Sequence, residues 1–484
     1  MALVIGIDSS TQSTKAVAHD LVTGAVVAAG SAPHPATAPP VSEQDPEAWW
    51  AALVDAVGQL GDARAEVVAV SVAGQQHGLV LLDGADRPVR PAKLWNDTTS
   101  APDADALVER LGADTWADRC GSVPVASFTV TKLAWTARNE PDALERATKV
   151  MLPHDYLTWR LTGEHVTDRG DVSGTGWFDP SNDRYRGELL AAATEPVGVS
   201  LDCPTVLAPT QRAGTLTPTA AAELGLPSGV VVGPGTGDNM GAALGLGLSG
   251  GDVAVSLGTS GTVYAVSTIG TSDATGAVAG FADATGRFLP LVCTLNATVV
   301  TDTVAAWLGT DAPGLSALAA EVAATNGGDE ELALVPYFDG ERTPNLPDAA
   351  GTWFGLRRTT TRAQLARAAH DGVLCGLLQG LDRLVDGGVT ADGTLHLIGG
   401  GARAAAYRQR CADLHGRPIV VPEADEAVAT GAALQAAAVH QSADLGSLAS
   451  AWGLGAGAVV EPVSDDGPDR RAVYAARAAM VADG

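Results

Sequence analysis

The chain has 484 residues, more than one hydrophobic core usually serves, so we expect two domains. Its 30 lysines and arginines against 56 aspartates and glutamates give a formal net charge of -26, which excludes a basic surface for nucleic acid or an anionic membrane. Five scattered cysteines without a CxxC pair, and no apolar run near the roughly 18 residues of a membrane span, predict a cytoplasmic protein.

The first predicted element is a β-hairpin. Residues 3–7 form an apolar run, a turn-rich segment follows from Asp8, and residues 15–19 return as a second strand, with a further strand at 24–29. Small residues let backbone amides approach an oxyanion, so the turn is a candidate phosphate cradle, and a tight turn without a ligand is the alternative. Asp8 is a candidate Mg²⁺ ligand, because magnesium prefers one or two carboxylates plus phosphates; turn formation is its alternative role.

A second group of polar residues follows the next predicted strand. Residues 45–61 predict a helix, with an Asp-Pro start and a glycine at its end. The apolar strand 67–72 then runs into Gln76 and His77, which places them at a strand's C-terminal end, where open α/β sheets bind ligands. Their amide and imidazole groups suit polyol hydroxyls, and a buried structural histidine is the alternative. An aromatic wall with polar tips, a common composition of sugar pockets, is offered by Trp95, Asn96 and Asp97.

Asp238 lies in the following polar loop. The short strand 230–232 leads into a glycine-rich segment, and an apolar, helix-like stretch comes after Asp238. A carboxylate within hydrogen-bond reach of an alcohol takes its proton as the oxygen attacks phosphorus, an effect of about 10² to 10⁴ in rate. Asp238 is therefore a candidate general base, and a helix cap is the alternative interpretation.

A second hairpin is predicted at 253–266, where a Gly/Thr/Ser turn joins two apolar strands. Further on, residues 395–401 form a strand that enters three glycines, and a helix and the strand 418–421 follow, as in a wound α/β domain. The turns of both segments are candidate nucleotide cradles. The two hairpins align as an internal repeat in which Gly258 overlies Ser10, Thr259 overlies Thr11 and Thr262 overlies Thr14.

The commonest nucleotide-binding motifs do not fit the sequence. It contains no Gly-Lys-Ser/Thr, which excludes a P-loop, and Gly235-Thr-Gly237 lacks the full dinucleotide spacing. The His-Arg-Asp motif of protein kinases is also absent.

Taken in order, these segments resemble the FGGY family of carbohydrate kinases, within the actin-like ATPase superfamily, over nearly the whole chain. Residues 127–135 are similar to one family signature, and residues 351–356 with 364–371 are similar to the second. Three positions depart from the family pattern: Ser10 stands where many relatives have glycine, and Thr136 and His370 stand where apolar residues are usual. The motifs most similar to the xylulokinase branch are at 74–78, 94–97, 237–239, 256–261, 340–344 and 398–402.

The resemblance implies two actin-like (ribonuclease H-like) α/β domains with mixed sheets flanked by helices and a cleft between them. Residues 1–246 are expected to bind the sugar and residues 247–484 to bind ATP. The implied reaction is phosphorylation of D-xylulose at O5 by ATP, with Asp238 as general base and Asp8 at Mg²⁺. The implied sugar contacts are Gln76, His77, Trp95, Asn96, Asp97 and Asn239, and the implied ATP contacts are Thr11, Gln12, Ser13, Lys15, Thr259, Ser260, Gly400, Gly401 and Ala402.

Several alternatives stay open at this point. Another acceptor in the same family, such as ribulose, gluconate, glycerol or rhamnulose, differs from D-xylulose only through the fine placement of pocket groups. An actin-like or chaperone-like ATPase module would need no sugar and would lack the Gln-His and Trp-Asn-Asp elements. A silent sugar sensor would have lost the base or gained a DNA-binding segment. We expect a small-molecule sugar and ATP as partners, with no nucleic acid and no membrane, and a homodimer stays open.

Overall fold

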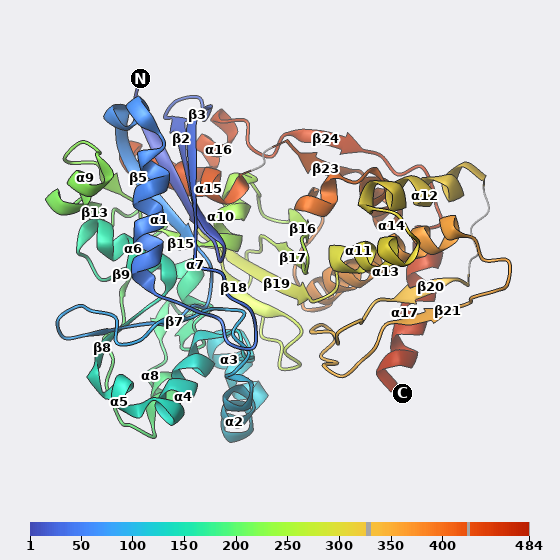
Figure 1. Ribbon diagram of the computed structural model, residues 1–484, viewed down its shortest axis with the longest axis horizontal. Coiled ribbons are helices and arrows are strands. Elements are labelled where there is room, and N and C mark those ends of the chain that lie inside the picture. Colours follow the sequence, from blue (N-terminus) through green and yellow to red (C-terminus); the bar gives the residue numbers. More distant parts are fainter. Residues whose placement is uncertain (326–330, 424–425, 484) are drawn as a thin grey trace. The chain divides into compact units, whose positions relative to one another are not determined.

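The computed structural model describes residues 1–325, 331–423 and 426–483 (Figure 1). The chain forms two compact α/β units, each with a mixed sheet and helices. Unit 1 comprises Met1–Leu248, Thr268–Leu289 and Ala424–Gly455, and unit 2 comprises Ser249–Ser267, Pro290–Glu423 and Ala456–Gly484. The predicted fold class, two α/β domains with mixed sheets, is confirmed.

Unit 1 is built on a sheet whose strands lie in the order β13-β14-β5-β1-β2-β3, with β15 also paired to β5. The predicted N-terminal hairpin is present: β1 (Leu3–Ser9) and β2 (Ser13–Asp20) are antiparallel, and β3 (Val26–Pro33) continues the sheet. On its other side β1 runs parallel to β5 (Val67–Gly74). The C-terminal ends of β1 and β5 therefore lie at the same edge of the sheet.

The two faces of this sheet carry different helices. Residues alternate between the faces along a strand, and Ile5 and Ile7 of β1 pack with Trp49 of α1 (Pro46–Gly58) in one apolar core. The predicted cap is present, because Asp45 accepts a hydrogen bond from the Glu47 amide at 3.0 Å. Gly6, between the two isoleucines, faces the other way, where a side chain would collide with the backbone of α15 (Ala427–Gln441).

The helix α15 belongs to unit 1 although it follows most of unit 2 in the chain. A Cβ at Gly6 would lie 1.7 Å from the Ala429 carbonyl oxygen, and a Cβ at Gly431 would lie 1.9 Å from that of Gly241 in α10 (Asp238–Gly245). Such close backbone contacts need glycine. Because of this packing, the division into continuous halves at residue 246 is incomplete: residues 268–289 and 424–455 also join the first unit.

Unit 2 repeats the arrangement of unit 1. Its sheet has β16 (Val253–Leu257) between the antiparallel β17 (Gly261–Ala265) and the parallel β22 (Leu395–Ile398). The two hairpins differ by one residue, since Ser9 pairs with Thr14 but Leu257 pairs with Gly261. The predicted overlay therefore holds through the turn, but Thr262 corresponds in register to Lys15 rather than to Thr14.

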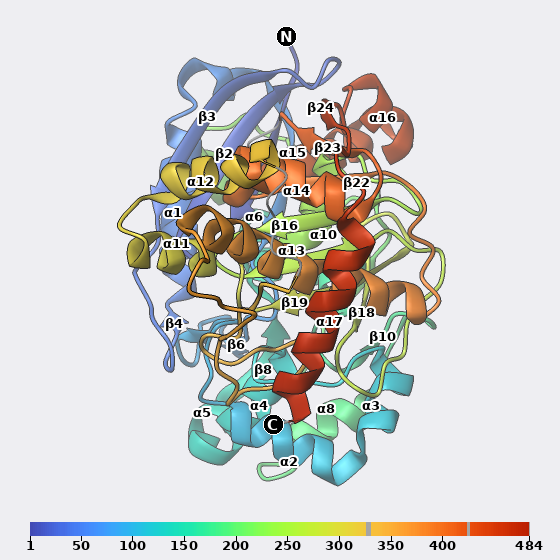
Figure 2. The same ribbon diagram turned by 90° about the vertical axis from the view of Figure 1, so that its right-hand side faces the viewer.

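Helices cover the sheet of unit 2. The helix α13 (Arg362–Asp386) packs on β17, and α14 (Ala405–His415) and α17 (Gly467–Asp483) pack against α13 (Figure 2). Buried Arg410 of α14 is paired with Asp371 of α13 at 2.8 Å, which joins these helices by a charge-assisted bond. The other elements of unit 2 are α11 (Thr298–Trp307), α12 (Ala312–Thr325), β20 (Ala333–Val335), β21 (Thr352–Phe354), β23 (Ile419–Pro422) and β24 (Gly457–Val460), with β19 (Phe288–Thr294) entering its sheet.

No helix among the described residues is long and apolar enough to cross a membrane.

The rest of unit 1 consists of shorter elements. These elements are β4 (Glu43–Gln44), β6 (Val80–Asp83), β7 (Ala92–Lys93), α2 (Ala101–Leu111), α3 (Ala113–Cys120), α4 (Thr129–Asn139), α5 (Pro141–Arg146), β8 (Ala147–Met151), α6 (Pro153–Thr162), β9 (Val166–Asp168), α7 (Arg169–Val172), β10 (Phe178–Asp179), β11 (Arg184–Tyr185), α8 (Gly187–Thr194), β12 (Thr205–Leu207), β13 (Gly214–Thr215), α9 (Pro218–Leu224), β14 (Val231–Val232), β15 (Thr236–Gly237), β18 (Ala279–Ala282) and α16 (Leu445–Ala451).

Candidate active site

Three adjacent strand ends of unit 1 bring the main candidate residues together. Asp8 at the end of β1 pairs in register with Ala73 of β5, and Ala73 pairs in turn with Thr236 of β15. Gln76 and His77 directly follow β5, and Asp238 directly follows β15. The polar loops that follow these strands therefore meet at one edge of the sheet of unit 1.

Asp238 occupies the first position of α10, and Gly237 is the N-cap. The Asp238 Oδ1 atom accepts from the Asn239 amide at 2.8 Å and from the Asn239 side chain at 3.1 Å. Asn239 also donates to Gln76 Oε1 at 2.8 Å, so a hydrogen-bonded chain joins the loop after β5 to Asp238. Asp238 as a whole residue is half-buried.

Two acidic groups at this edge have raised pKa values. Burial, together with the negative charges of Asp8 and Asp171, raises the pKa of Asp238 to about 7. Burial raises the pKa of Asp8 to about 6, with Lys15 lowering and Glu426 raising it. A carboxylate that titrates near neutrality is suited to general-base catalysis.

The surroundings of Asp8 fit a magnesium ion. Its Oδ1 atom is buried and has no hydrogen-bond partner among the described residues, which leaves a hard oxygen ligand unused. The part of the chain that the structure describes holds no cluster of three or more His, Cys, Asp or Glu side chains for a metal. Magnesium in phosphoryl transfer needs only one or two carboxylates, because substrate phosphates and water complete its coordination.

His77 is held in an unusual backbone conformation. It has a φ of 66°, which is uncommon for a residue with a side chain and marks strain that functional sites often store. Its ring stacks on Phe128 at 4.9 Å, and its Nδ1 atom lies 2.8 Å from the Gly174 carbonyl oxygen. A carbonyl oxygen can only accept, so Nδ1 carries a proton and donates it to Gly174.

The three residues of the Trp95-Asn96-Asp97 segment have different environments. Trp95 is 40 % exposed and donates its indole N–H to Thr11 Oγ1 at 2.8 Å. Asn96 has a buried Oδ1 atom without a hydrogen-bond partner among the described residues. Asp97 is fully buried and accepts from the Ser42 amide at 2.9 Å and from Lys93 Nζ at 3.1 Å. These internal partners occupy its carboxylate, and its contact with the sugar stays a prediction.

The turn after β1 is fixed from behind by buried side chains. Gln44 donates to the Thr11 carbonyl oxygen at 3.0 Å, and Trp49 donates to Gln44 Oε1 at 2.7 Å. Ser10 is not among the described non-glycine residues with positive φ, so this turn tolerates serine where relatives have glycine. Gln12 is exposed, Ser13 is half-buried, and Lys15 is paired with Glu426 at 2.7 Å.

The predicted ATP residues of unit 2 also lie together. The turn with exposed Thr259 and half-buried Ser260 joins β16 to β17 and contacts the start of α11 through the Thr259 carbonyl oxygen. Gly399 has a φ of 85° and ends β22, and a Cβ at Gly401 would lie 2.8 Å from Leu257 Cβ. Gly400 faces open space and Ala402 is buried. The ends of the parallel strands β16 and β22 thus bring both turns to one place.

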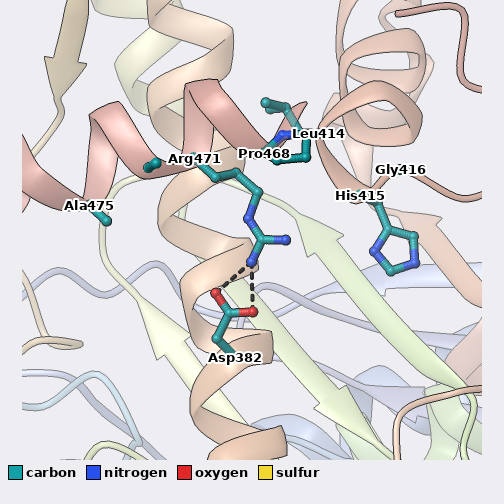
Figure 3. A pocket seen from close by; sticks show the side chains of 8 residues that line it. Asp382, Leu414, His415, Gly416, Pro468, Arg471 and Ala475 are labelled. Atoms are coloured by element: carbon teal, nitrogen blue, oxygen red, sulfur yellow. Dashed lines mark hydrogen bonds and ion pairs between the residues drawn. The ribbon is translucent and has the colours of Figure 1, made fainter. Parts of the chain in front are cut away.

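A separate hollow of about 360 Å³ lies in unit 2 (Figure 3). Arg471 donates to Asp382 at 2.6 Å across this hollow, so the two charges satisfy each other. It contains no residue predicted for the sugar or for ATP. Its lining residues are Asp382, Leu414, His415, Gly416, Pro468, Arg471, Ala472 and Ala475.

The two polar departures from the family signatures are satisfied within their own helices. Buried Thr136 donates to the Lys132 carbonyl oxygen at 2.8 Å. The Nδ1 atom of buried His370 lies 2.8 Å from the Ala366 carbonyl oxygen. Each side chain thus bonds the carbonyl four residues earlier, which removes the cost of burying a polar group.

Sequence reasoning missed a buried acidic cluster behind the site. His154 contacts Asp171 and Asp155, and Thr236 of β15 donates to Asp168 at 2.9 Å. The available signals were the Pro-His-Asp start of α6 and the Asp-x-x-Asp spacing at α7, and the second is also an ordinary helix cap.

Comparison with known proteins decides the family. The profile described as "FGGY family of carbohydrate kinases, N-terminal domain" matches residues 3–245, and the profile of the C-terminal domain matches residues 253–440. The chain belongs to the FGGY family of carbohydrate kinases.

Individual FGGY kinases are similar over almost the full length. A xylulose kinase of Streptomyces coelicolor is 51% identical over 467 residues, which cover 96% of this chain and 93% of the relative. The crystal structure of xylulose kinase from Bifidobacterium adolescentis has a TM-score of 0.87 and 39% identity, covering 99% of both chains. The structure of Plasmodium falciparum glycerol kinase with ADP also has a TM-score of 0.87, and the match covers 99% of this chain and 98% of that chain. Its sequence identity is only 18%, so this similarity shows the fold alone.

The raised pKa of Asp238 predicts a pH dependence for this FGGY kinase. A base must be deprotonated to act, and a raised pKa means that it is protonated over more of the acidic range. We expect kcat/KM for the sugar at saturating MgATP to fall with decreasing pH below about 7. Steady-state assays across the neutral range measure this, and a value that stays constant down to about pH 5 would contradict it.

The burial of Asp97 predicts a structural role that stability measurements can separate from ligand binding. Burial alone would raise its pKa, but hydrogen bonds from Thr99, Ser42 and Lys93 lower it overall. We expect Asp97→Ala to reduce the free energy of unfolding by about 3 kcal/mol, because one member of a buried ion pair is lost. Urea titration followed by circular dichroism tests this. An unchanged unfolding midpoint with a raised KM for the sugar would instead support ligand contact.

Proposed function

We propose that the protein phosphorylates D-xylulose at O5 with ATP, giving D-xylulose 5-phosphate and ADP. The observation that carries this proposal is the chain of hydrogen bonds from Gln76 through Asn239 to Asp238, next to His77. Amide and imidazole groups beside a carboxylate with a pKa near 7 suit a polyol whose hydroxyl must be deprotonated. The similarity to xylulose kinases over nearly the whole chain supports this sugar.

In the proposed step Asp238 takes the proton of the O5 hydroxyl. The oxygen forms a bond to the γ-phosphorus of ATP as the bond from that phosphorus to the β,γ-bridging oxygen breaks, and ADP leaves. Asp8 would hold magnesium, which when bound neutralises charge on the phosphates. Asn239, Gln76 and His77 orient the sugar.

Each unit carries a small-residue turn that is proposed to bind nucleotide phosphate. In unit 1 the turn at Thr11, Gln12 and Ser13, with Lys15 behind it, offers hydroxyls and backbone amides to phosphate. In unit 2 Thr259 and Ser260 do the same, and Gly400, Gly401 and Ala402 contact the adenosine. The absence of a Cβ at Gly400 leaves the backbone open to a close approach.

The sugar assignment is tested by a panel of acceptors. The fold itself does not select the sugar, since a glycerol kinase has the same fold. We expect D-xylulose to give the highest kcat/KM in an ADP-release assay against ribulose, rhamnulose, gluconate and glycerol. If another acceptor leads, the kinase assignment stands and the sugar is wrong. ATP hydrolysis that no acceptor stimulates would instead favour an ATPase module.

The base assignment is tested by Asp238→Asn, which keeps the shape and removes the proton acceptor. We expect kcat to fall by about 10² to 10⁴, because the sugar hydroxyl then has no base. The affinity for ATP, measured by calorimetry with a non-hydrolysable analogue, should stay within about twofold, a difference well below 1.4 kcal/mol. Near-native turnover by this variant would refute the role of Asp238.

A further inference from the structure

A histidine surrounded by carboxylates lies beneath the candidate sugar site. His154 of α6 is completely buried, with its Nδ1 atom 2.7 Å from Asp171 Oδ2 and its Nε2 atom 3.0 Å from Asp155 Oδ1. Asp168 Oδ1 is 3.7 Å from the same Nε2. All three aspartates are buried as well, so the cluster is shielded from solvent. Nothing in the phosphoryl-transfer chemistry proposed above uses these groups.

The carboxylates around His154 favour its charged form. Burial alone would lower its pKa, but Asp155, Asp171 and Asp168 raise it to about 9. Its Nδ1 atom is hydrogen-bonded to Asp171, whereas the carboxylate of Asp155 lies near Nε2 without hydrogen-bond geometry. The bond to Asp171 is therefore charge-assisted at both ends, and such bonds hold their partners firmly.

Asp171 connects this cluster to the residues that face the sugar. A methyl group placed at Gly237 would lie 3.1 Å from Asp171 Oδ1 and 2.8 Å from Gln76 Cγ, so Asp171 and Gln76 meet directly beneath the residue that precedes Asp238. The Asp171 Oδ1 atom is buried and has no hydrogen-bond partner among the described residues. Its charge contributes to the raised pKa of Asp238, which is consistent with this proximity.

The turn that follows Asp171 holds His77. The Asp171 carbonyl oxygen accepts from the Gly174 amide at 2.9 Å, and the Gly174 carbonyl oxygen lies 2.8 Å from His77 Nδ1. A Cβ at Gly174 would lie 2.6 Å from His77 Cε1, so the turn presses against the imidazole. A movement of Asp171 would therefore be passed on to His77.

We propose that Asp171, held by its hydrogen bond to the buried ring of His154, is a positioning residue that sets Gln76 and His77 for the sugar. This inference rests on the proposed function, because it assigns those side chains to the sugar. Asp171 acts through its neighbours and contacts neither ATP nor the transferred phosphoryl group. Its removal should therefore weaken binding of the sugar much more than binding of the nucleotide.

The first test replaces Asp171 by asparagine, which has the same shape but loses the charge. We expect the KM for D-xylulose to rise about tenfold, because a charge-assisted hydrogen bond that positions Gln76 and His77 is weakened. The KM for MgATP should stay within about twofold of the wild type. Asp179→Asn is the matched control, because Asp179 is also a buried, ion-paired aspartate of unit 1. The control should leave both KM values unchanged. Equal increases in the two KM values for Asp171→Asn, or no increase, would overturn the proposal.

The second test separates positioning from simple stability. His154→Gln removes the positive charge and leaves the buried carboxylates without a counter-ion, whereas His154→Lys keeps a positive charge at the same place. We expect the lysine variant to retain a KM for D-xylulose within about threefold of the wild type and the glutamine variant to show the larger increase. If His154→Gln does not fold, the comparison of Asp171→Asn with His154→Lys still decides. A lysine variant with as large a rise in this KM as Asp171→Asn would contradict the role of the cation.

The two levels of proposal fail in different ways. If the wild type does not turn over D-xylulose, the proposed function fails before any variant is made. If the wild type does turn over D-xylulose and Asp171→Asn keeps the wild-type KM for it, only the positioning role is refuted. The same KM ratio, measured with whichever acceptor leads the panel, tests Asp171 if the sugar assignment changes.

Discussion

The active edge of unit 1 depends on three places where backbones touch without side chains. A methyl group has no room at Gly6 of β1, at Gly245 of α10, or at Gly431 of α15, where it would meet the carbonyl oxygen of Gly241. Asp8 lies two residues beyond Gly6 on the same strand, and Asp238 begins the helix that contains Gly241. The helix α15 therefore positions both the proposed metal ligand, Asp8, and the proposed base, Asp238. A larger side chain at any of these glycines would displace at least one of the two carboxylates.

The environment of the base is the second constraint. Negative charges at Asp8 and Asp171, together with burial, keep the proton affinity of Asp238 high enough for it to accept a proton near neutral pH. Such crowding of acids is costly, and the buried imidazolium of His154 offsets part of it. The site is thus a balance of like charges, in which each acid tunes its neighbours as well as performing its own role.

Much of this arrangement could be predicted from sequence because its signals are local. Alternating apolar runs, the Asp45 cap and polar residues after strands predicted both hairpins and the placement of Gln76 and Asp238 at strand ends. The polar character of Asp97 does not reveal that Lys93 and Ser42 occupy its carboxylate, so only the structure shows these partners. The His154 cluster was missed because its members come from α6, β9 and α7, and only tertiary packing joins them. The place of α15 in unit 1 is equally non-local.

The return of the chain to unit 1 also constrains how the protein can be made. Residues 424–455 complete the first unit, but they are synthesised after almost all of the second. A domain that folds during synthesis needs its whole core to have left the ribosome. The sheet of unit 1 must therefore wait, with the face that receives α15 uncovered, until about nine-tenths of the chain has been translated. For the same reason, a cut near residue 246 would yield two fragments, of which the first lacks a helix of its own core.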